Sequence, residues 1–121
     1  MALAESPSPI GPVVDWSAAL INTAGDEVLL QELVTIYLEE SPQWLRAIRD
    51  SMSRQDAAQM HRSAHTLRGA LETIGALTVA AVAKELEMIG RQGTVANAEP
   101  VFRSLREQTD QLAPVLKRRL T

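Results

Sequence analysis

Apolar residues recur along most of this chain at spacings of three and four, which is the period of an amphipathic helix. The clearest segment runs from Asp56 to Gly75, where Asp56 can cap the first turn and Gly75 suits the C-terminal stop. Its apolar stripe consists of Ala57, Met60, Ala64, Leu67, Leu71 and Ile74. No segment shows the period of two that a half-buried strand requires. The pattern therefore predicts an all-α protein.

Two helices are predicted before this segment. A short helix begins beside Asp15 and breaks at residues 24–26. A longer helix starts near Asp26 and continues to about Met52, and Pro42 predicts a kink or a restart within it, because proline removes an intrahelical hydrogen bond. The inner face of this longer helix is expected to carry Val28, Leu29, Leu33, Ile36 and Tyr37.

Two more helices are predicted after it. One covers residues 77–91, with Gly90 and Gly93 fraying its end, and the other covers residues 98–119 with a bend at Pro114. Their inward positions are Val79, Val82, Leu86, Ile89, Val101, Leu105, Leu112, Val115 and Leu116. Four long amphipathic segments with short connections predict an antiparallel four-helix bundle with a short additional N-terminal helix. We place this domain at residues 15–121 and interpret the Pro-rich residues 1–14 as a flexible lead or linker.

Composition narrows the possible functions. A length of 121 residues fits one domain, and a hydrophobic content of 45% is enough for a compact core. A net charge of −3 disfavours a nucleic-acid partner, and the lack of cysteine excludes disulfides, thiolate zinc sites and cysteine nucleophiles. No apolar run approaches the roughly 18 residues that a membrane span needs. We therefore expect a cytoplasmic monomer without membrane or nucleic-acid contacts.

The candidate chemistry is centred on His65. This residue falls outside the apolar stripe, on a helix face that it shares with His61, Arg68 and Gly69. A neutral imidazole can attack phosphorus, and an arginine one turn away can form charge-assisted hydrogen bonds with phosphoryl oxygens. A helical glycine costs about 1 kcal/mol relative to alanine, but it lets a bulky group approach the backbone. The group therefore suits a phosphate-accepting histidine.

The spacing H-x-L-[KR]-G-x(5)-G-A, which runs from His65 to Ala76, resembles the histidine-containing phosphotransfer (HPt) domains of bacterial phosphorelays. The segments 16–20 and 25–30 also resemble the start of that family's domains. The resemblance implies that His65 is the phosphorylated residue. It places Arg68 at the family's cation position, where lysine is more common, and Gly69 at the small residue beside the histidine.

The resemblance also implies roles for residues around the histidine. Glu87 and Arg91 match positions next to it, and a carboxylate that accepts the Nδ1–H would leave Nε2 as the nucleophile. Glu87 equally suits a solvated surface, and Arg91 equally suits the C-terminal end of its helix. Partner docking is expected around the histidine, at His61, Thr66, Ala70 and Thr73.

No Gly-rich nucleotide loop occurs in the sequence, so we expect a phosphocarrier rather than an enzyme that uses ATP. By resemblance, the partners are response-regulator receiver domains and a hybrid sensor histidine kinase. Receiver domains would supply Mg²⁺, so no cofactor or metal is expected on this chain. The sequence leaves open whether the domain stands alone or belongs to a hybrid kinase.

Two alternatives come from other classes of protein. The chain could be a helical interaction module that docks a partner through the His65 face without chemistry. His61 and His65 also have the spacing of two metal ligands, with Glu72 as a third. The H-E-x-x-H signature is absent, however, and Arg62 and Arg68 oppose a divalent ion.

Overall fold

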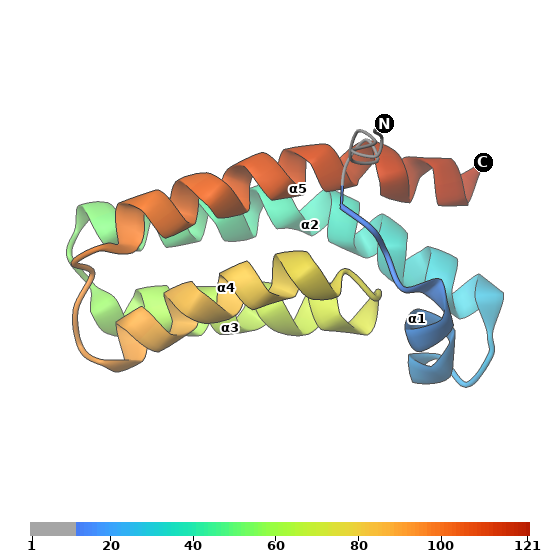
Figure 1. Cartoon of the computed structure of the whole chain (residues 1–121), viewed down its shortest axis with the longest axis horizontal. Helices are drawn as coiled ribbons and strands as arrows, with labels where there is room; N and C mark the ends of the chain where they lie inside the picture. Colours follow the sequence, from blue (N-terminus) through green and yellow to red (C-terminus); the bar gives the residue numbers. More distant parts are fainter. Residues whose placement is uncertain (1–11) are drawn as a thin grey trace, which may run out of the picture.

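The computed structural model describes residues 12–121, and within this range the chain forms helices and no strands. The helices are α1 (Trp16–Asn22), α2 (Glu27–Ser53), α3 (Ala57–Thr73), α4 (Leu77–Arg91) and α5 (Ala98–Leu120). The helices α2 to α5 lie side by side as a bundle, and α1 lies at one end of it (Figure 1). The predicted four-helix bundle with a short N-terminal helix is therefore confirmed.

The bundle is uneven around its circumference. Each long helix packs on the next one in the chain, and α5 returns beside α2 to close the bundle. Helices α3 and α4 pack most closely, whereas α2 and α5 approach each other least. The pair α3/α4 and the pair α2/α5 form opposite layers of the bundle (Figure 1).

Aspartates start the first three helices as the sequence predicts. Asp15, Asp26 and Asp56 each accept the backbone N–H of the residue three positions later, at 2.9 to 3.0 Å. Such a cap satisfies one of the backbone donors that the first turn leaves without a partner. The reciprocal half of a capping box is not formed at Asp56, because the Gln59 side chain bonds Ser63 instead.

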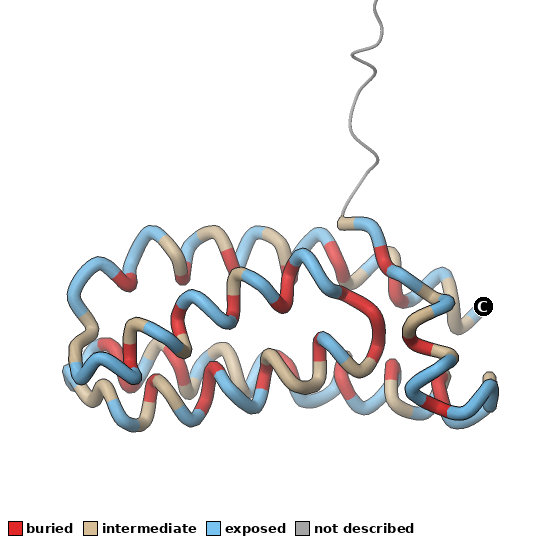
Figure 2. The backbone as a smooth tube through the Cα atoms, turned by 60° about the horizontal axis from the view of Figure 1, so that its bottom comes forward, coloured by how far each residue is buried: buried red, intermediate tan, exposed pale blue. Residues whose placement is uncertain are grey.

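The apolar stripe of α3 forms the centre of the core. All its predicted members are buried except Ala57, which is half-buried (Figure 2). On α4 and α5 the predicted inward residues are buried or half-buried. The sequence pattern missed Phe102, which is 2% exposed and is the largest fully buried side chain of α5.

The predicted inner face of α2 is wrong in its first half. Val28, Leu29 and Ile36 are 69%, 40% and 50% exposed. The buried positions are instead Leu30, Val34, Tyr37, Ser41, Ile48, Ser51 and Met52. The apolar residues near the start of α2 surround the helix, so they fit two registers, but only the observed register continues past Ser41 to Ile48 and Met52.

Helix α2 also runs through Pro42 without interruption, so the predicted restart is wrong. Pro42 is exposed, and Tyr37 and Ile48 on either side of it face the same core. Burial of apolar side chains on both sides therefore keeps the two halves in one helix, despite the hydrogen bond that proline removes.

The expectation that Gly90 frays α4 is also wrong. Gly90 lies inside α4 and is buried against α3. A Cβ at this position would lie 2.7 Å from the Ala57 carbonyl oxygen and 2.8 Å from the His61 backbone nitrogen. Glycine is therefore required there for the close packing of α4 on α3.

Gly75 joins the start of the domain to the α3–α4 turn. Its φ of +83° suits the position that follows the end of α3. The Asp15 backbone N–H donates to the Gly75 carbonyl at 2.9 Å, and a side chain on Gly75 would collide with Asp15. Val14, just before this contact, is buried. Residues 1–11 of the predicted Pro-rich lead lie outside the described residues.

The C-terminal end of α5 contacts the first two helices. Arg119 pairs with Glu27 at 2.7 Å and lies over the Trp16 ring, 4.6 Å from its centroid. These contacts fix α1 against the end of the bundle. None of the helices in residues 12–121 is long and apolar enough to cross a membrane.

Candidate functional site

His65 lies on the solvent side of α3, where it faces Glu87 of α4. Its side chain is 60% exposed, whereas the Glu87 side chain is only 14% exposed. The Nδ1 atom of His65 lies 2.8 Å from Oε2 of Glu87. The structure therefore confirms that His65 lies outside the core, and it brings Glu87 into contact with the ring.

The charge state of Glu87 indicates whether Nδ1 of His65 or the carboxylate carries the hydrogen in this contact. Partial burial acts to raise the pKa of Glu87, but hydrogen bonds from Arg68 and His65 outweigh it, and the pKa lies below its usual value. A carboxylate can only accept, so Nδ1 of His65 carries the hydrogen and donates it. In the neutral ring, Nε2 then holds the free lone pair. No group in residues 12–121 forms a hydrogen bond to this Nε2.

Arg68 is held by two carboxylates rather than directed into solvent. Its Nε donates to Oε1 of Glu87, and its Nη1 donates to both oxygens of Glu72 at 3.0 Å. These hydrogen bonds, first the one donated to Glu87 and then those donated to Glu72, raise the pKa of Arg68. The Arg68 Nη2 atom also lies 3.0 Å from Nδ1 of His65; because a guanidinium can only donate, this is a close contact rather than a hydrogen bond when Nδ1 carries its hydrogen toward Glu87. Arg68 therefore fixes the carboxylate that orients the histidine.

His61 is anchored by the same residue as His65. Its Nδ1–H donates to the backbone carbonyl of Glu87 at 2.9 Å, because a carbonyl can only accept. The two imidazole rings are stacked with centroids 6.4 Å apart and planes inclined by 23°. The backbone of Glu87 therefore holds the His61 ring and its side chain holds the His65 ring, in both cases through Nδ1.

A shallow hollow runs along the α3/α4 seam at these rings. It is lined by His61, Arg62, His65, Thr66, Glu87 and Arg91. Arg91 and Thr66 are exposed, whereas Ala70 and Thr73 further along α3 are half-buried. The hydroxyls of Thr66 and Thr73 donate to carbonyls of their own helix, at 3.2 and 2.9 Å. Arg91 of α4 therefore lines the same hollow as the exposed ring.

Gly69 lies one turn after His65 on α3, and within residues 12–121 no neighbouring side chain or backbone requires a glycine there. A Cβ built on Gly69 would meet nothing within 4 Å, in contrast to Gly90. Its φ does not lie in the left-handed region. The surface beside His65 is therefore open to the close approach of another molecule.

A three-ligand metal site is not supported. The described part of the chain contains no group of three His, Cys, Asp or Glu residues placed to hold a metal ion. Glu72, the third ligand of that alternative, is paired with Arg68. The guanidinium of Arg68 also occupies the space beside Nδ1 of His65.

Three elements of the site lie beyond what the sequence analysis predicted. These are the pairing of Arg68 with both carboxylates, the bond from His61 to the Glu87 backbone, and the glycine contact that brings α3 and α4 together. The spacing of Arg68 and Glu72 by four on one helix is a local signal for their ion pair. The other two depend on the distance between helices.

Comparison with known proteins places the chain in a family. The family model for the Hpt domain matches residues 32–114, which is more than half of the chain. The chain therefore belongs to the Hpt domain family. Members of this family are phosphocarrier modules of two-component phosphorelays, and they lack ATP sites.

A solved structure agrees with the fold. The crystal structure of the HPT domain from the Hpt sensor hybrid histidine kinase of Shewanella matches with a TM-score of 0.76. The sequences are 24% identical, and the match covers 87% of this chain and 91% of that one. At this identity the likeness supports the fold. No curated protein matches the chain.

Proposed function

We propose that this chain carries a phosphoryl group on Nε2 of His65 between receiver domains. The observation that carries the proposal is the 2.8 Å contact of Nδ1 with the Glu87 carboxylate on an otherwise exposed ring. That contact supports the tautomer in which Nε2 would be the nucleophile. Membership of the Hpt domain family supports a phosphotransfer role.

In the proposed reaction, the Nε2 lone pair of His65 attacks the phosphorus of an aspartyl phosphate on a receiver domain. The N–P bond forms as the P–O bond to the aspartate breaks, and the aspartate leaves as a carboxylate. The ring then carries positive charge, which the Glu87 carboxylate stabilises across the Nδ1–H bond. Transfer to a second receiver reverses these steps, so the chain ends unchanged.

The open surface at Gly69 and the cationic hollow suit this exchange. A receiver must approach His65 closely enough for in-line transfer, and a side chain at position 69 would obstruct it. Arg91 lies at the hollow and can add positive potential near the transferred phosphoryl group. Mg²⁺ is expected on the receiver, because catalysis of this kind depends on charge stabilisation that the receiver's acidic pocket would organise.

The test is transfer of radiolabelled phosphate from a phosphorylated receiver domain to the full chain. We expect label that is labile in acid and stable in base on the wild type, and none on His65→Gln. His61→Gln tests whether the label resides on the neighbouring imidazole: it should still be labelled, but more slowly, because His61 lies in the expected docking surface. If His65→Gln is labelled like the wild type, the proposal is wrong. If receivers bind the chain but never label it, a docking module without chemistry is the better account.

A further inference from the structure

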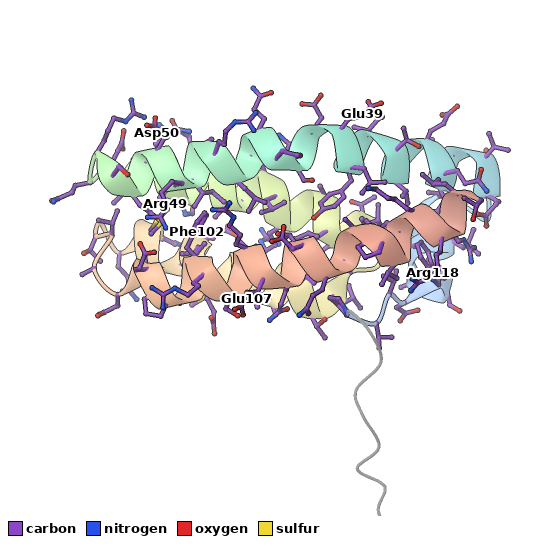
Figure 3. The ribbon with its side chains drawn as sticks, turned by 90° about the horizontal axis from the view of Figure 1, so that it is seen from above. Glu39, Arg49, Asp50, Phe102, Glu107 and Arg118 are labelled. Carbon is purple, nitrogen blue, oxygen red and sulfur yellow. The ribbon has the colours of Figure 1, made fainter. Side chains whose placement is uncertain are left out.

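A second site lies on the opposite layer of the bundle from His65. Between α2 and α5 there is a cleft of about 520 Å³, which we call the α2/α5 cleft. Figure 3 shows Arg49 of α2 and Phe102 of α5 in the space between these helices. The cleft exists because α2 and α5 pack less closely than the other neighbouring helices.

The wall of the cleft contains a buried polar atom without a partner. Tyr37 is 3% exposed, and its hydroxyl forms no hydrogen bond. Burial raises the pKa of Tyr37 to about 12, although the Ser41 hydroxyl nearby acts to lower it. The two hydroxyls do not reach hydrogen-bond geometry. An unsatisfied buried hydroxyl is unfavourable, but this one is covered on the side of the cleft as well, so a ligand in the cleft does not contact it.

The rim of the cleft is cationic although the chain has a net charge of −3. Arg46, Arg49, Arg106 and Lys117 line it, and Asp110 is the one acidic residue among the lining. Arg49 is neutralised by Glu99 at 2.7 Å. Within residues 12–121, the other three cations form no ion pair. Their positive potential is thus available to an anion.

The floor of the cleft is apolar. Leu38 and Leu45 of α2 are half-buried along it, and Phe102 lies beneath the guanidinium of Arg49, 4.6 Å from the ring centroid. A bare inorganic anion would leave these surfaces uncovered. A ligand with an apolar body and one anionic group would cover the floor and reach the rim together.

We infer that the α2/α5 cleft binds a small organic anion, with an aromatic or alicyclic body and a carboxylate, sulfonate or phosphate group. The anionic group pairs with Arg46, Arg106 and Lys117. Because the cleft and the His65 site lie on opposite layers, the inference does not depend on phosphotransfer.

The probe for this site is anilinonaphthalene sulfonate, which has an aromatic body and a single anionic group. Its binding to the full chain is followed by fluorescence, and the site is located by amide shifts in a two-dimensional ¹H–¹⁵N NMR spectrum. We expect saturable binding of one molecule, with shifts concentrated at residues that line the α2/α5 cleft. Phenylnaphthylamine, the uncharged analogue, and inorganic phosphate should each bind at least about fivefold more weakly. Equal binding of either analogue, or shifts elsewhere, would overturn the inference.

Two arginine variants show whether the probe binds in the cleft or is attracted by positive surface charge in general. Arg106→Gln should weaken binding about fivefold, since it removes one charge-assisted contact. Arg103→Gln is the matched control, because Arg103 is an exposed arginine of the same helix that does not line the cleft. Equal effects of the two arginine variants would contradict the assignment.

Discussion

The two layers of the bundle are built in opposite ways. At the α3/α4 seam a buried glycine lets the helices touch through their backbones, and each ring nitrogen Nδ1 of the two histidines is tied to Glu87. At the α2/α5 cleft the helices pack less closely, and a tyrosine hydroxyl has no hydrogen-bond partner among residues 12–121. Close packing of α3 on α4 holds the imidazole in one hydrogen-bonded position, and a nucleophile requires such a fixed position. Looser packing of α2 on α5 leaves space between the helices, and a ligand requires such space.

The largest expected effect comes from comparing alanine substitutions at two helical glycines, Gly90 of α4 and Gly69 of α3. Gly90→Ala should destabilise the chain by about 2 kcal/mol or more, because its Cβ would overlap the backbone of α3. Gly69→Ala should instead stabilise it by up to about 1 kcal/mol, since its Cβ meets nothing and alanine favours the helix. Both changes gain the same helix propensity, so the difference in their free energies of unfolding measures the packing of the seam. Equal effects in a denaturant titration would refute the tight seam.

Glu87 provides the next test, because it connects both histidines and Arg68. Glu87→Ala should cost about 1 to 2 kcal/mol, since it leaves Arg68 with Glu72 alone and removes the partner of His65. Glu85→Ala, an exposed carboxylate of the same helix, is the control and should change little.

The contribution of Glu87 also depends on pH. Its pKa in the folded chain lies below its ordinary value of 4.5. The stabilisation is therefore fully present above pH 4.5 and is lost as the pH falls through the lower folded-state value. In unfolding titrations, Glu87→Ala should lack this acid-dependent loss, while Glu85→Ala should keep it. A parallel acid dependence of Glu87→Ala and the wild type would show that the carboxylate is not stabilised as described.

The sequence predicted the architecture for reasons that are local. Asp15, Asp26 and Asp56 cap helices through contacts three residues away, and the α3 stripe has one unambiguous register. The start of α2 offered apolar residues on every side, so its inner face could not be chosen without the helices that cover it. Gly90 near a helix end has the pattern of a stop, and only its contact with His61 shows that it is a packing residue.

The site was predictable to the extent that it lies on one helix. His65, Arg68 and Gly69 are neighbours on α3, and the family resemblance extended the site to Glu87. The α2/α5 cleft carries no such signal. Its cations belong to helices about 60 positions apart in sequence, and the isolation of the Tyr37 hydroxyl depends on how far apart those helices lie.

A small gain in stability, rather than a loss, is expected for a substitution at the α2/α5 cleft. Tyr37→Phe removes a buried hydroxyl that has no partner, so it should stabilise the unliganded chain by about 1 kcal/mol. The measurement is thermal unfolding of both proteins without added anions. A loss of stability of similar size would mean that the hydroxyl has a partner in solution, and the contrast between the layers would weaken.

The smallest effect is expected at the rim of the cleft. Arg49→Gln breaks the pair with Glu99, but both side chains are more than 40% exposed, at 43% and 48%. Exposed pairs of this kind contribute little to stability, and the contribution decreases with salt. Unfolding at low and high salt should show a small difference between the proteins that diminishes as salt is added. A larger, salt-independent loss would indicate that the stacking on Phe102 dominates.

The most direct measurement of the central claim is a long-range ¹H–¹⁵N NMR spectrum of the histidine rings, recorded before and after phosphorylation by a receiver domain. The account predicts that in the neutral, free chain His65 carries its hydrogen on Nδ1, and that the phosphoryl group then appears on Nε2 of the same ring. A hydrogen on Nε2 in the free chain, with phosphorylation at Nδ1 or at another residue, would contradict the role assigned to Glu87 and His65.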